Sequence, residues 1–471
     1  MAKRLITEDV RMETDEGTQK MTFKDDDWTA RAPYRNCSAQ FHLTEKDKRN
    51  AFDRQYHSFY EARIWATKQR ILENADRFIG KGKYSFRSMN DIAPLEEVLV
   101  IGVIVKRLTQ RPGVLKALIN EERAAYANYD EEDEPNTDLR CLISDEDYLE
   151  LESDQQIVKL AGNIKMDDCA TGCCEEGDVF TVKQVVWPMQ APQPALSANR
   201  PSVNVAFTSG LELTGIINDD IKTISSFQML SDWLKNDADM VNGNERLQNE
   251  VDRLVVLGQS IECRQAHDVY SVVKMLTLTK SEKKTSFQAL SALDRLFCGL
   301  AEKVQVDVAS GLGDPCPSLY PQQPIHRATL PRTAHTAKKV NLVTNPYEFE
   351  LGGVRFLCTS GENVSDLLRM SLEWTGCDVL ENILKWQHIA PTCPDTLDGF
   401  PMTHRDALFM ESTPHVLICG NQPRAESRWV DLGEGRRCLC ICLPKFSQSR
   451  MVCTLDLSKL EVNWHMFEHD F

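Results

Sequence analysis

The spacing of apolar positions predicts a leader and a long helix at the start of the chain. Residues 1–40 are polar and mixed in charge and show no sustained periodicity, which is typical of a loosely ordered segment. From Lys46 to about Ile79, apolar and aromatic side chains recur at spacings of three, four and seven residues. This pattern predicts an amphipathic helix that packs on its own domain.

Short apolar runs after this helix predict β-strands. Gly102 and Gly162 lie inside two of the runs, and a glycine within a strand is typical of a bend or a β-bulge. Several short strands so close together, two of them interrupted by glycine, predict a small barrel or sandwich. The expected strands are 98–105, 148–152, 157–164 and 179–187.

Residues 188–201 predict a linker, because four prolines in fourteen residues give a stiff, extended connector. Beyond it, strands alternate with helices, which predicts an α/β layered domain. Its expected strands are 203–207, 254–257 and 304–308, and its expected helices are 221–234, 287–297 and a short one containing Leu247 and Val251. The strands 354–357, 415–419, 438–443 and 452–455 are expected to form the second sheet of an α/β sandwich. The predicted division is a leader (1–40), a helix-and-strand domain (41–187), the linker (188–201) and an α/β domain (202–471).

The charge balance limits the function. The chain has 54 Lys and Arg against 70 Asp and Glu, a net charge of −16, so it is a poor free-standing binder of DNA or of anionic membranes. No apolar run approaches the length of about 20 residues that a transmembrane helix needs. The N-terminus turns acidic by Asp9, where a secretory signal would need an apolar core. The acidic run Asp130–Glu134 precedes Pro135 and predicts an exposed loop.

The 16 cysteines are expected to be thiols in a reducing compartment. Cys169, Cys173 and Cys174 cluster among acidic residues, but a structural zinc site usually has a second ligand pair at fixed spacing. A second group alternates along a predicted strand, which places its members on one face, where they are expected to fill the core like small apolar residues. These are Cys438, Cys440 and Cys442.

Five predicted strands of the α/β domain end in a glycine-bearing turn. Ligands of open α/β sheets bind at the carboxyl ends of strands, so these turns are where a site is expected. Gly258, Gly311 and Gly420 are expected to be constrained turn residues. The five turns are 208–212, 258–260, 309–314, 358–362 and 420–423.

The layout of these turns resembles the calcineurin-like metallophosphoesterase fold. Active members of that family carry Asp, Asn and His ligands there for two metal ions, which activate a hydroxide. Here the corresponding positions are Gly210, Glu212, Gln259, Leu312, Gly313, Ser360, Asn421 and Pro423. Only Glu212 retains a carboxylate, and the histidines His388, His404 and His415 do not follow strands. The resemblance therefore implies a retained fold with no catalytic residues, no metal and no cofactor.

Longer stretches resemble the small-subunit (B-subunit) family of DNA polymerase delta. In the α/β domain they are 321–326, 342–347, 353–366 and 388–397, and upstream they are 55–63 and 150–162. The resemblance spans about residues 40–455 and implies an α/β plus β chain: an N-terminal OB-fold barrel followed by a calcineurin-like α/β sandwich. The segment 169–178 is shorter and more acidic than the family's, and Trp464–Phe471 has no counterpart.

By this resemblance the chain is a non-catalytic nuclear scaffold for DNA replication and repair. The implied partners are the cysteine-rich C-terminal domain of the polymerase delta catalytic subunit and a third, clamp-tethering subunit. The family also shares this subunit with polymerase zeta, and contact with DNA would be indirect. The alternatives are a B-type subunit of polymerase alpha or epsilon, or an active metal-dependent phosphodiesterase or nuclease.

Overall fold

The computed structural model describes residues 32–468 with interruptions. The segments outside the described residues are 50–55, 93–96, 109–143, 154–155, 165–178, 236–239, 242–243, 246–250, 263–279, 302–303, 337–338 and 403, together with 1–31 and 469–471. The expected acidic loop Asp130–Glu134 and the cluster Cys169, Cys173 and Cys174 lie outside the described residues.

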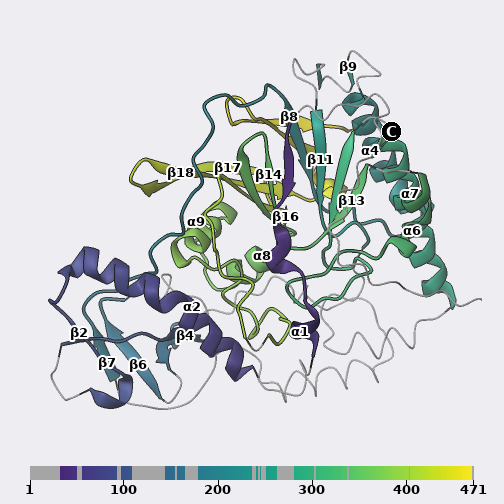
Figure 1. Cartoon of the computed structure of the whole chain (residues 1–471). Helices are drawn as coiled ribbons and strands as arrows, with labels where there is room; N and C mark the ends of the chain where they lie inside the picture. The colour runs from purple at the N-terminus through teal and green to yellow at the C-terminus, as the bar shows by residue number, and fades with distance from the viewer. Residues whose placement is uncertain are drawn as a thin grey trace, which may run out of the picture.

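Two six-stranded sheets form the main body of the molecule (Figure 1). The first has the order β1 (Tyr34–Asn36), β14 (Tyr347–Leu351), β15 (Val354–Thr359), β16 (Val416–Gln422), β18 (Arg436–Pro444) and β17 (Glu426–Gly433). The second has the order β13 (Val340–Val343), β12 (Gln305–Ala309), β11 (Val251–Leu257), β8 (Asn204–Thr208), β19 (Met451–Asp456) and β20 (Glu461–Met466). Strands β15, β16 and β18 are parallel in the first sheet, and β8, β11, β12 and β13 are parallel in the second.

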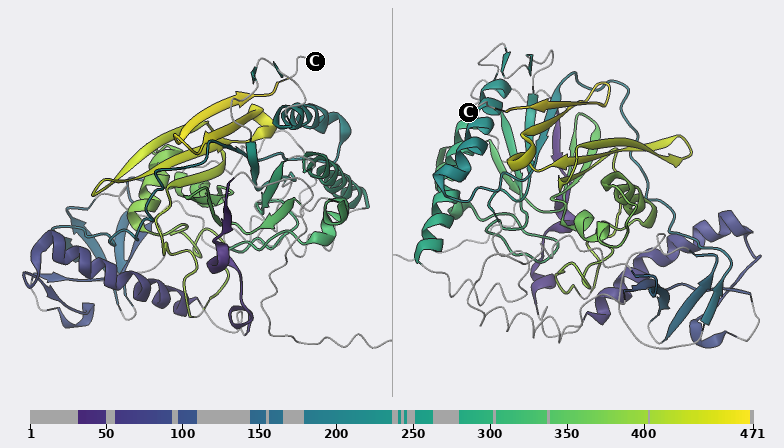
Figure 2. Two further views of the ribbon diagram at one scale, coloured as in Figure 1. Left: turned by 45° about the horizontal axis from the view of Figure 1, so that its top comes forward. Right: turned by 180° about the vertical axis from the view of Figure 1, so that it is seen from behind.

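Helices cover the outer face of each sheet, which gives a four-layered arrangement (Figures 1 and 2). The helices are α4 (Ile217–Leu234), α6 (Lys280–Leu300) and α7 (Pro331–Thr336) against the second sheet, and α8 (Glu362–Leu368) and α9 (Gly376–Trp386) against the first. The inner faces of the two sheets pack on each other through Phe207 and Phe356, whose ring centroids lie 5.8 Å apart. The described part of this region also contains η7 (Arg327–Thr329), α10 (Phe446–Ser449) and the pair β9 (Met240–Val241) and β10 (Asn244–Glu245).

Strand β18 shows how the sequence pattern sets the layers. Leu439 and Ile441 face the second sheet, whereas the alternating Cys438, Cys440 and Cys442 face α9. The prediction that these three cysteines share one face is therefore confirmed. Helix α9 begins at a capping box, in which the Thr375 hydroxyl accepts a hydrogen bond from the Asp378 amide.

A smaller module precedes the main body and lies beside it, at the lower left of Figure 1. It contains α2 (His57–Ala75), η3 (Asp76–Gly80) and η4 (Met89–Asp91), with the short parallel pair β2 (Ser85–Phe86) and β3 (Val98–Leu99), whereas α1 (Glu45–Lys48) lies below the main body in Figure 1. A sheet of the order β4 (Val103–Arg107), β5 (Tyr148–Glu152), β6 (Ile157–Gly162) and β7 (Val179–Val182) completes it. Over the described residues this sheet is open, and the expected closed barrel is not seen.

The glycines in this sheet have the predicted effect. The expected strand 98–105 is divided into β3, which ends at Leu99, and β4, which begins at Val103, directly after Gly102. A Cβ atom on Gly102 would lie 2.5 Å from the Glu152 carbonyl oxygen, so only glycine allows the two backbones to approach this closely.

The expected leader 1–40 differs from the structure in its last part. Residues Tyr34–Asn36 pair with β14 as an edge strand, and η1 (Ser38–Phe41) follows with Phe41 fully buried. Three residues are too few to show a period, and their pairing partner lies more than 300 positions away, so no local pattern could reveal this strand.

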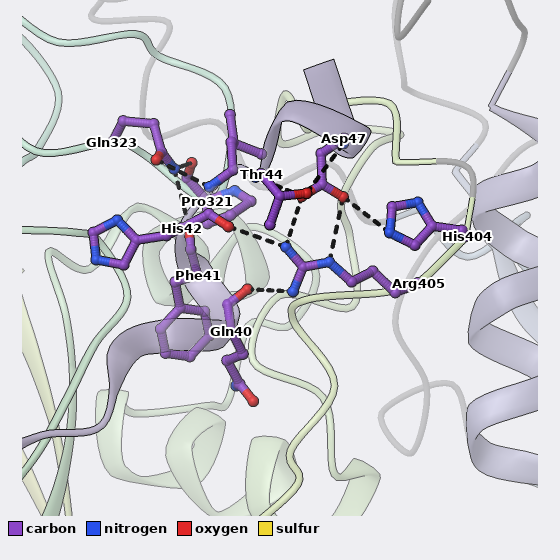
Figure 3. Close-up of polar contacts among 10 residues, drawn as sticks. Gln40, Phe41, His42, Thr44, Asp47, Pro321, Gln323, His404 and Arg405 are labelled. Carbon is purple, nitrogen blue, oxygen red and sulfur yellow. Dashed lines mark hydrogen bonds and ion pairs between the residues drawn. The ribbon is translucent and has the colours of Figure 1, made fainter. Parts of the chain in front are cut away.

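A polar cluster fixes the segment after β1 to the main body (Figure 3). The Arg405 guanidinium donates to Asp47 at 2.9 Å and to the Gln40 carbonyl oxygen at 2.7 Å, and His404 lies 3.3 Å from the same carboxylate. Burial opposes ionisation of Asp47, but hydrogen bonds from Arg405 and Thr44 outweigh it and lower the pKa of Asp47 to about 2.

The predicted linker 188–201 has no regular structure and lies along the main body. The Ala191 amide donates to Gln387, and the Pro192 carbonyl oxygen accepts from the Thr413 amide at 3.0 Å. The Arg200 guanidinium donates to the Leu457 carbonyl oxygen at 2.7 Å. This connector is therefore held at several points along its length.

Two further expectations need correction. The strand at 452–455 is expected in one sheet with 354–357, 415–419 and 438–443. It pairs instead as β19, antiparallel with β8, in the sheet that holds 203–207, 254–257 and 304–308. Val251, expected in a short helix, begins β11. No helix in the described part of the chain has the length and apolar character needed to cross a membrane.

Candidate functional site

The five glycine-bearing turns meet at one place, between the carboxyl ends of the parallel strands. The Gly210 amide donates to the Gly258 carbonyl oxygen at 3.1 Å. The Asn421 side chain donates to the Ser360 carbonyl oxygen at 2.7 Å. A Cβ atom on Gly258 would lie 2.7 Å from the Gly311 Cα, so the second and third turns touch through their backbones. We call this meeting point the strand-end pocket.

The backbone of the strand-end pocket is left-handed at several residues. Glu212, Gln259 and Asn421 have φ values of 48°, 52° and 57°, and the glycines Gly210 and Gly258 have 63° and 62°. This conformation is uncommon for residues with a Cβ atom, and such strain tends to collect at functional sites. Left-handed backbone therefore recurs in the turns that meet here.

Glu212 is the one carboxylate among the eight ligand positions named in the sequence, and both of its oxygens have partners. The Lys445 ammonium lies 2.7 Å from one carboxylate oxygen, which also accepts a hydrogen bond from the Gln259 amide at 2.9 Å. The hydroxyl of Ser447 donates to the other oxygen. A protein cation and two neutral donors thus surround the carboxylate.

A second carboxylate, Glu362, holds the other side of the pocket. It accepts from the Leu312 amide at 2.6 Å and from the Ser360 hydroxyl at 2.5 Å. Tyr320 and Asn345 also donate to it. Burial, followed by the charge of Glu362, raises the pKa of the Tyr320 hydroxyl well above its usual value, so Tyr320 stays a neutral donor.

Asp314 is a buried acid at the end of the third turn. One of its carboxylate oxygens accepts from the Ser260 and Ile261 amides, whereas the other is buried with no hydrogen-bond partner. Burial is the main cause that raises the pKa of Asp314 to about 8, although the backbone hydrogen bonds oppose it. At neutral pH this acid is therefore largely protonated.

The structure brings together most of the positions singled out in the sequence. Gly210, Glu212, Gln259, Ser360 and Asn421 lie in the pocket, and Leu312 joins it through its backbone amide. Gly313 and Pro423 are exposed at its edge. Within the described ranges, no three ligand atoms from His, Cys, Asp or Glu converge at these turns.

The histidines have structural partners away from the pocket. His388 lies 2.7 Å from the Asp406 carboxylate, and His415 accepts from the Arg355 amide at 2.9 Å through Nδ1. The other ring nitrogen of His415 lies 2.8 Å from the Pro194 carbonyl oxygen. Both ring nitrogens of His415 therefore have backbone partners, as is typical of a structural histidine.

Sequence reasoning missed several residues of the pocket. Lys445 directly follows β18, whose predicted range was 438–443, so the strand-end rule applied to this sixth strand would have found it. Glu362 lies inside a turn that was considered only for its histidine position. Tyr320 and Asn345 come from loops without periodicity, which give no local signal.

Two family comparisons match the two parts of the chain. The sequence model of the family of B-type subunits of DNA polymerases alpha and epsilon matches residues 205–427, which include all five turns. That of the DNA polymerase delta subunit OB-fold domain matches residues 55–175 in the N-terminal module. The two matches put a B-type polymerase subunit region after an OB-fold region, in the order that the sequence resemblance implied.

Full-length relatives specify which polymerase. The chain is 50% identical over 456 residues to the probable DNA polymerase delta small subunit of Caenorhabditis elegans, a match that covers 94% of this chain and 99% of the relative. It is 28% identical to DNA polymerase delta subunit 2 of Drosophila melanogaster, covering 93% and 98% of the two chains. It is 27% identical to the small subunit of Saccharomyces cerevisiae, covering 88% and 89%. The chain belongs to the family of DNA polymerase delta small subunits, the accessory subunits of this replicative polymerase.

Proposed function

We propose that this chain is a non-catalytic nuclear scaffold that joins the subunits of DNA polymerase delta in replication and repair. Its partners in this proposal are the cysteine-rich C-terminal domain of the catalytic subunit and the third, clamp-tethering subunit. The polymerase zeta catalytic subunit is proposed as an alternative partner. The observation that carries the proposal is the strand-end pocket, where donors from the protein itself, Lys445 among them, bind the carboxylates Glu212 and Glu362.

The pocket supports an inactivated calcineurin-like phosphoesterase domain over 202–471, joined by the linker 188–201 to an OB-fold domain over 41–187. Two-metal hydrolysis needs several anionic or imidazole ligands around each ion. Glycine, leucine and proline at Gly210, Leu312 and Pro423 supply no side-chain ligand, and Lys445 neutralises Glu212. The ammonium group supplies the positive charge that a metal would supply, so the turns stay folded without one.

We expect no metal-dependent hydrolysis by this pocket. Purified chain incubated with Mn²⁺ should cleave neither bis(p-nitrophenyl) phosphate nor single-stranded DNA above a Lys445→Met variant, which alters the centre of the pocket. An active phosphodiesterase of the same fold serves as the positive control for the assay. Hydrolysis that rises with Mn²⁺ and falls in the Lys445→Met variant would contradict the proposal.

Exposed apolar side chains support docking of partners at two places. Trp65 on α2 is 81% exposed and Phe78 just after it is 70% exposed. Ile217 at the start of α4 and Phe287 on α6 are 76% and 72% exposed. Large apolar groups on a soluble protein often mark interfaces, and aromatic side chains dominate the energy of many of them.

The experiment that tests the scaffold is reconstitution with purified partner fragments. The C-terminal domain of the catalytic subunit and the N-terminal domain of the third subunit should each co-elute with the full chain and raise its melting temperature. We expect Trp65→Ser or Ile217→Ser to weaken binding of one fragment by at least about tenfold. Lys459→Ser, an exposed change elsewhere, is the matched control and should bind both fragments normally.

Two results would overturn this proposal. One is a monodisperse chain whose melting temperature does not respond to either fragment. The other is preferential binding to the corresponding domains of polymerase alpha or epsilon, which would move the chain to a different polymerase.

A further inference from the structure

Three neighbouring strands of the first sheet place sulfur and carboxylate ligands side by side. The register pairs Cys419 of β16 with Cys442 of β18, and Cys442 with Glu426 of β17. The three residues therefore form a row across the sheet. Cys377, the second residue of α9, lies above this row and completes a group of four.

The spacing of the sulfur atoms suits a metal ion. Cys442 Sγ lies 3.5 Å from Cys419 Sγ and 3.9 Å from Cys377 Sγ. Tetrahedral zinc with Zn–S bonds of about 2.3 Å places its sulfur ligands about 3.8 Å apart. The ligand atoms of Cys377, Cys442 and Glu426 all lie within 4.8 Å of one another, and Cys419, next to Cys442, offers the fourth ligand of a tetrahedral set.

An unpartnered polar atom lies beside this group. Gln422 is only 3% exposed, and its side-chain oxygen has no hydrogen-bond partner. Its amide nitrogen donates to the Gly361 and Gly420 carbonyl oxygens, which fixes the side chain. A Cβ atom on Gly376 would lie 2.7 Å from Cys442 Sγ and 3.7 Å from this oxygen, so the glycine leaves room between them.

Donors at the start of α9 hold the Glu426 carboxylate in place. The Thr375 hydroxyl donates to one oxygen of Glu426 at 3.1 Å, and the Cys377 amide donates to the other at 3.3 Å. Zinc binding would turn the three thiols into thiolates, and the N-terminus of α9 beside Cys377 would stabilise their negative charge. Glu426 is only partly buried, so an ion can reach the cysteines from that side.

We propose that Cys377, Cys419, Cys442 and Glu426 bind a zinc ion that ties α9 to the β16–β18–β17 side of the first sheet. Binding replaces the three thiol protons, which are released to solvent, and involves no change of oxidation state. This proposal departs from the sequence expectation that the chain holds no metal and that Cys442 only fills the core. The site is separate from the strand-end pocket and plays no part in hydrolysis.

The test is metal analysis of the full chain purified from zinc-supplemented culture. We expect one zinc per chain in the wild type and in the control Cys453→Ser, which removes a buried cysteine on the other sheet. Cys442→Ser should lose the zinc. Cobalt(II) added to metal-free wild type should give the strong thiolate-to-cobalt absorption and the visible bands of tetrahedral coordination.

A second variant keeps the test decisive if Cys442→Ser fails to fold. Glu426→Gln retains all three thiolates, so it should still give the cobalt absorption while binding zinc at least about tenfold more weakly. Zinc content that is equal in wild type and in folded Cys442→Ser would overturn the proposal. So would metal-free wild type whose mass shows a disulfide between two of the three cysteines. Neither result bears on the scaffold, which is tested by partner binding.

Discussion

Asp406→Ala is expected to destabilise the chain by about 3–5 kcal/mol, because it leaves a buried guanidinium without its counter-charge. The Arg63 guanidinium of α2 lies 2.9 Å from the Asp406 carboxylate, which is fully buried, and His388 lies 2.7 Å from the same oxygen. Arg63 also donates to the Cys393 carbonyl oxygen at 2.7 Å. The loss would be measured as a fall in the free energy of unfolding in urea, with circular dichroism as the signal.

The control is an ion pair of the same type on the surface. Arg77 lies 3.0 Å from Glu434, and both side chains are mostly exposed. Because exposed pairs contribute about 0–1 kcal/mol, Arg77→Ala should change stability by less than that. If the two substitutions had equal effects, the buried cluster would not be what holds α2 to the main body.

The same carboxylate predicts a pH dependence. Burial acts to raise the pKa of Asp406, but the charges of His388 and Arg63 outweigh it and lower the pKa well below its usual range. A depressed folded-state pKa stabilises the protein above the unfolded value of about 3.9 and loses this contribution as pH falls further. The free energy of unfolding should therefore drop below about pH 4 in wild type, and the drop should be smaller in Asp406→Asn.

The spacing of apolar residues predicted the helices and strands that bury one face against the core. Seven strands of the α/β domain (β8, β11, β12, β15, β16, β18 and β19) and the helices α4 and α6 were found because each has a run or a repeat of apolar positions. The same reasoning placed the cysteines of β18 on one face, as the cores on its two sides show. The strand-end rule then located the pocket, since parallel strands bring their carboxyl ends to one edge.

The remaining features depend on contacts that no local pattern records. The apolar pattern of β19 is like that of the other predicted strands, so it could not show which sheet the strand joins. Its pairing with β8 decides this. The pairing of Lys445 with Glu212 links positions more than 200 residues apart. The zinc proposal likewise needed the register of three strands and the position of α9, whereas the sequence offered only alternating cysteines.

Gly258→Ala is expected to destabilise the chain by about 3 kcal/mol, because it combines a strained backbone with a steric clash. Gly258 has a φ of +62°, a conformation that costs a residue with a Cβ atom about 1–2 kcal/mol. Its added Cβ would also lie 2.7 Å from the Gly311 Cα and 2.9 Å from the Ser310 carbonyl oxygen. Since both are backbone atoms, the turns must move apart, and overpacking of this kind costs about 1–3 kcal/mol more.

Gly435→Ala separates these two contributions. Gly435 has a φ of +75°, and nothing lies within 4 Å of its added Cβ, so this change should cost only the backbone strain of about 1 kcal/mol. Urea unfolding of both variants would measure the difference, which reports how tightly the second and third turns are packed. Equal losses in the two variants would mean that the turns of the strand-end pocket can separate freely. They would then no longer be the rigid remnant of a binding site, and the proposed inactivated phosphoesterase domain would lose its main structural support.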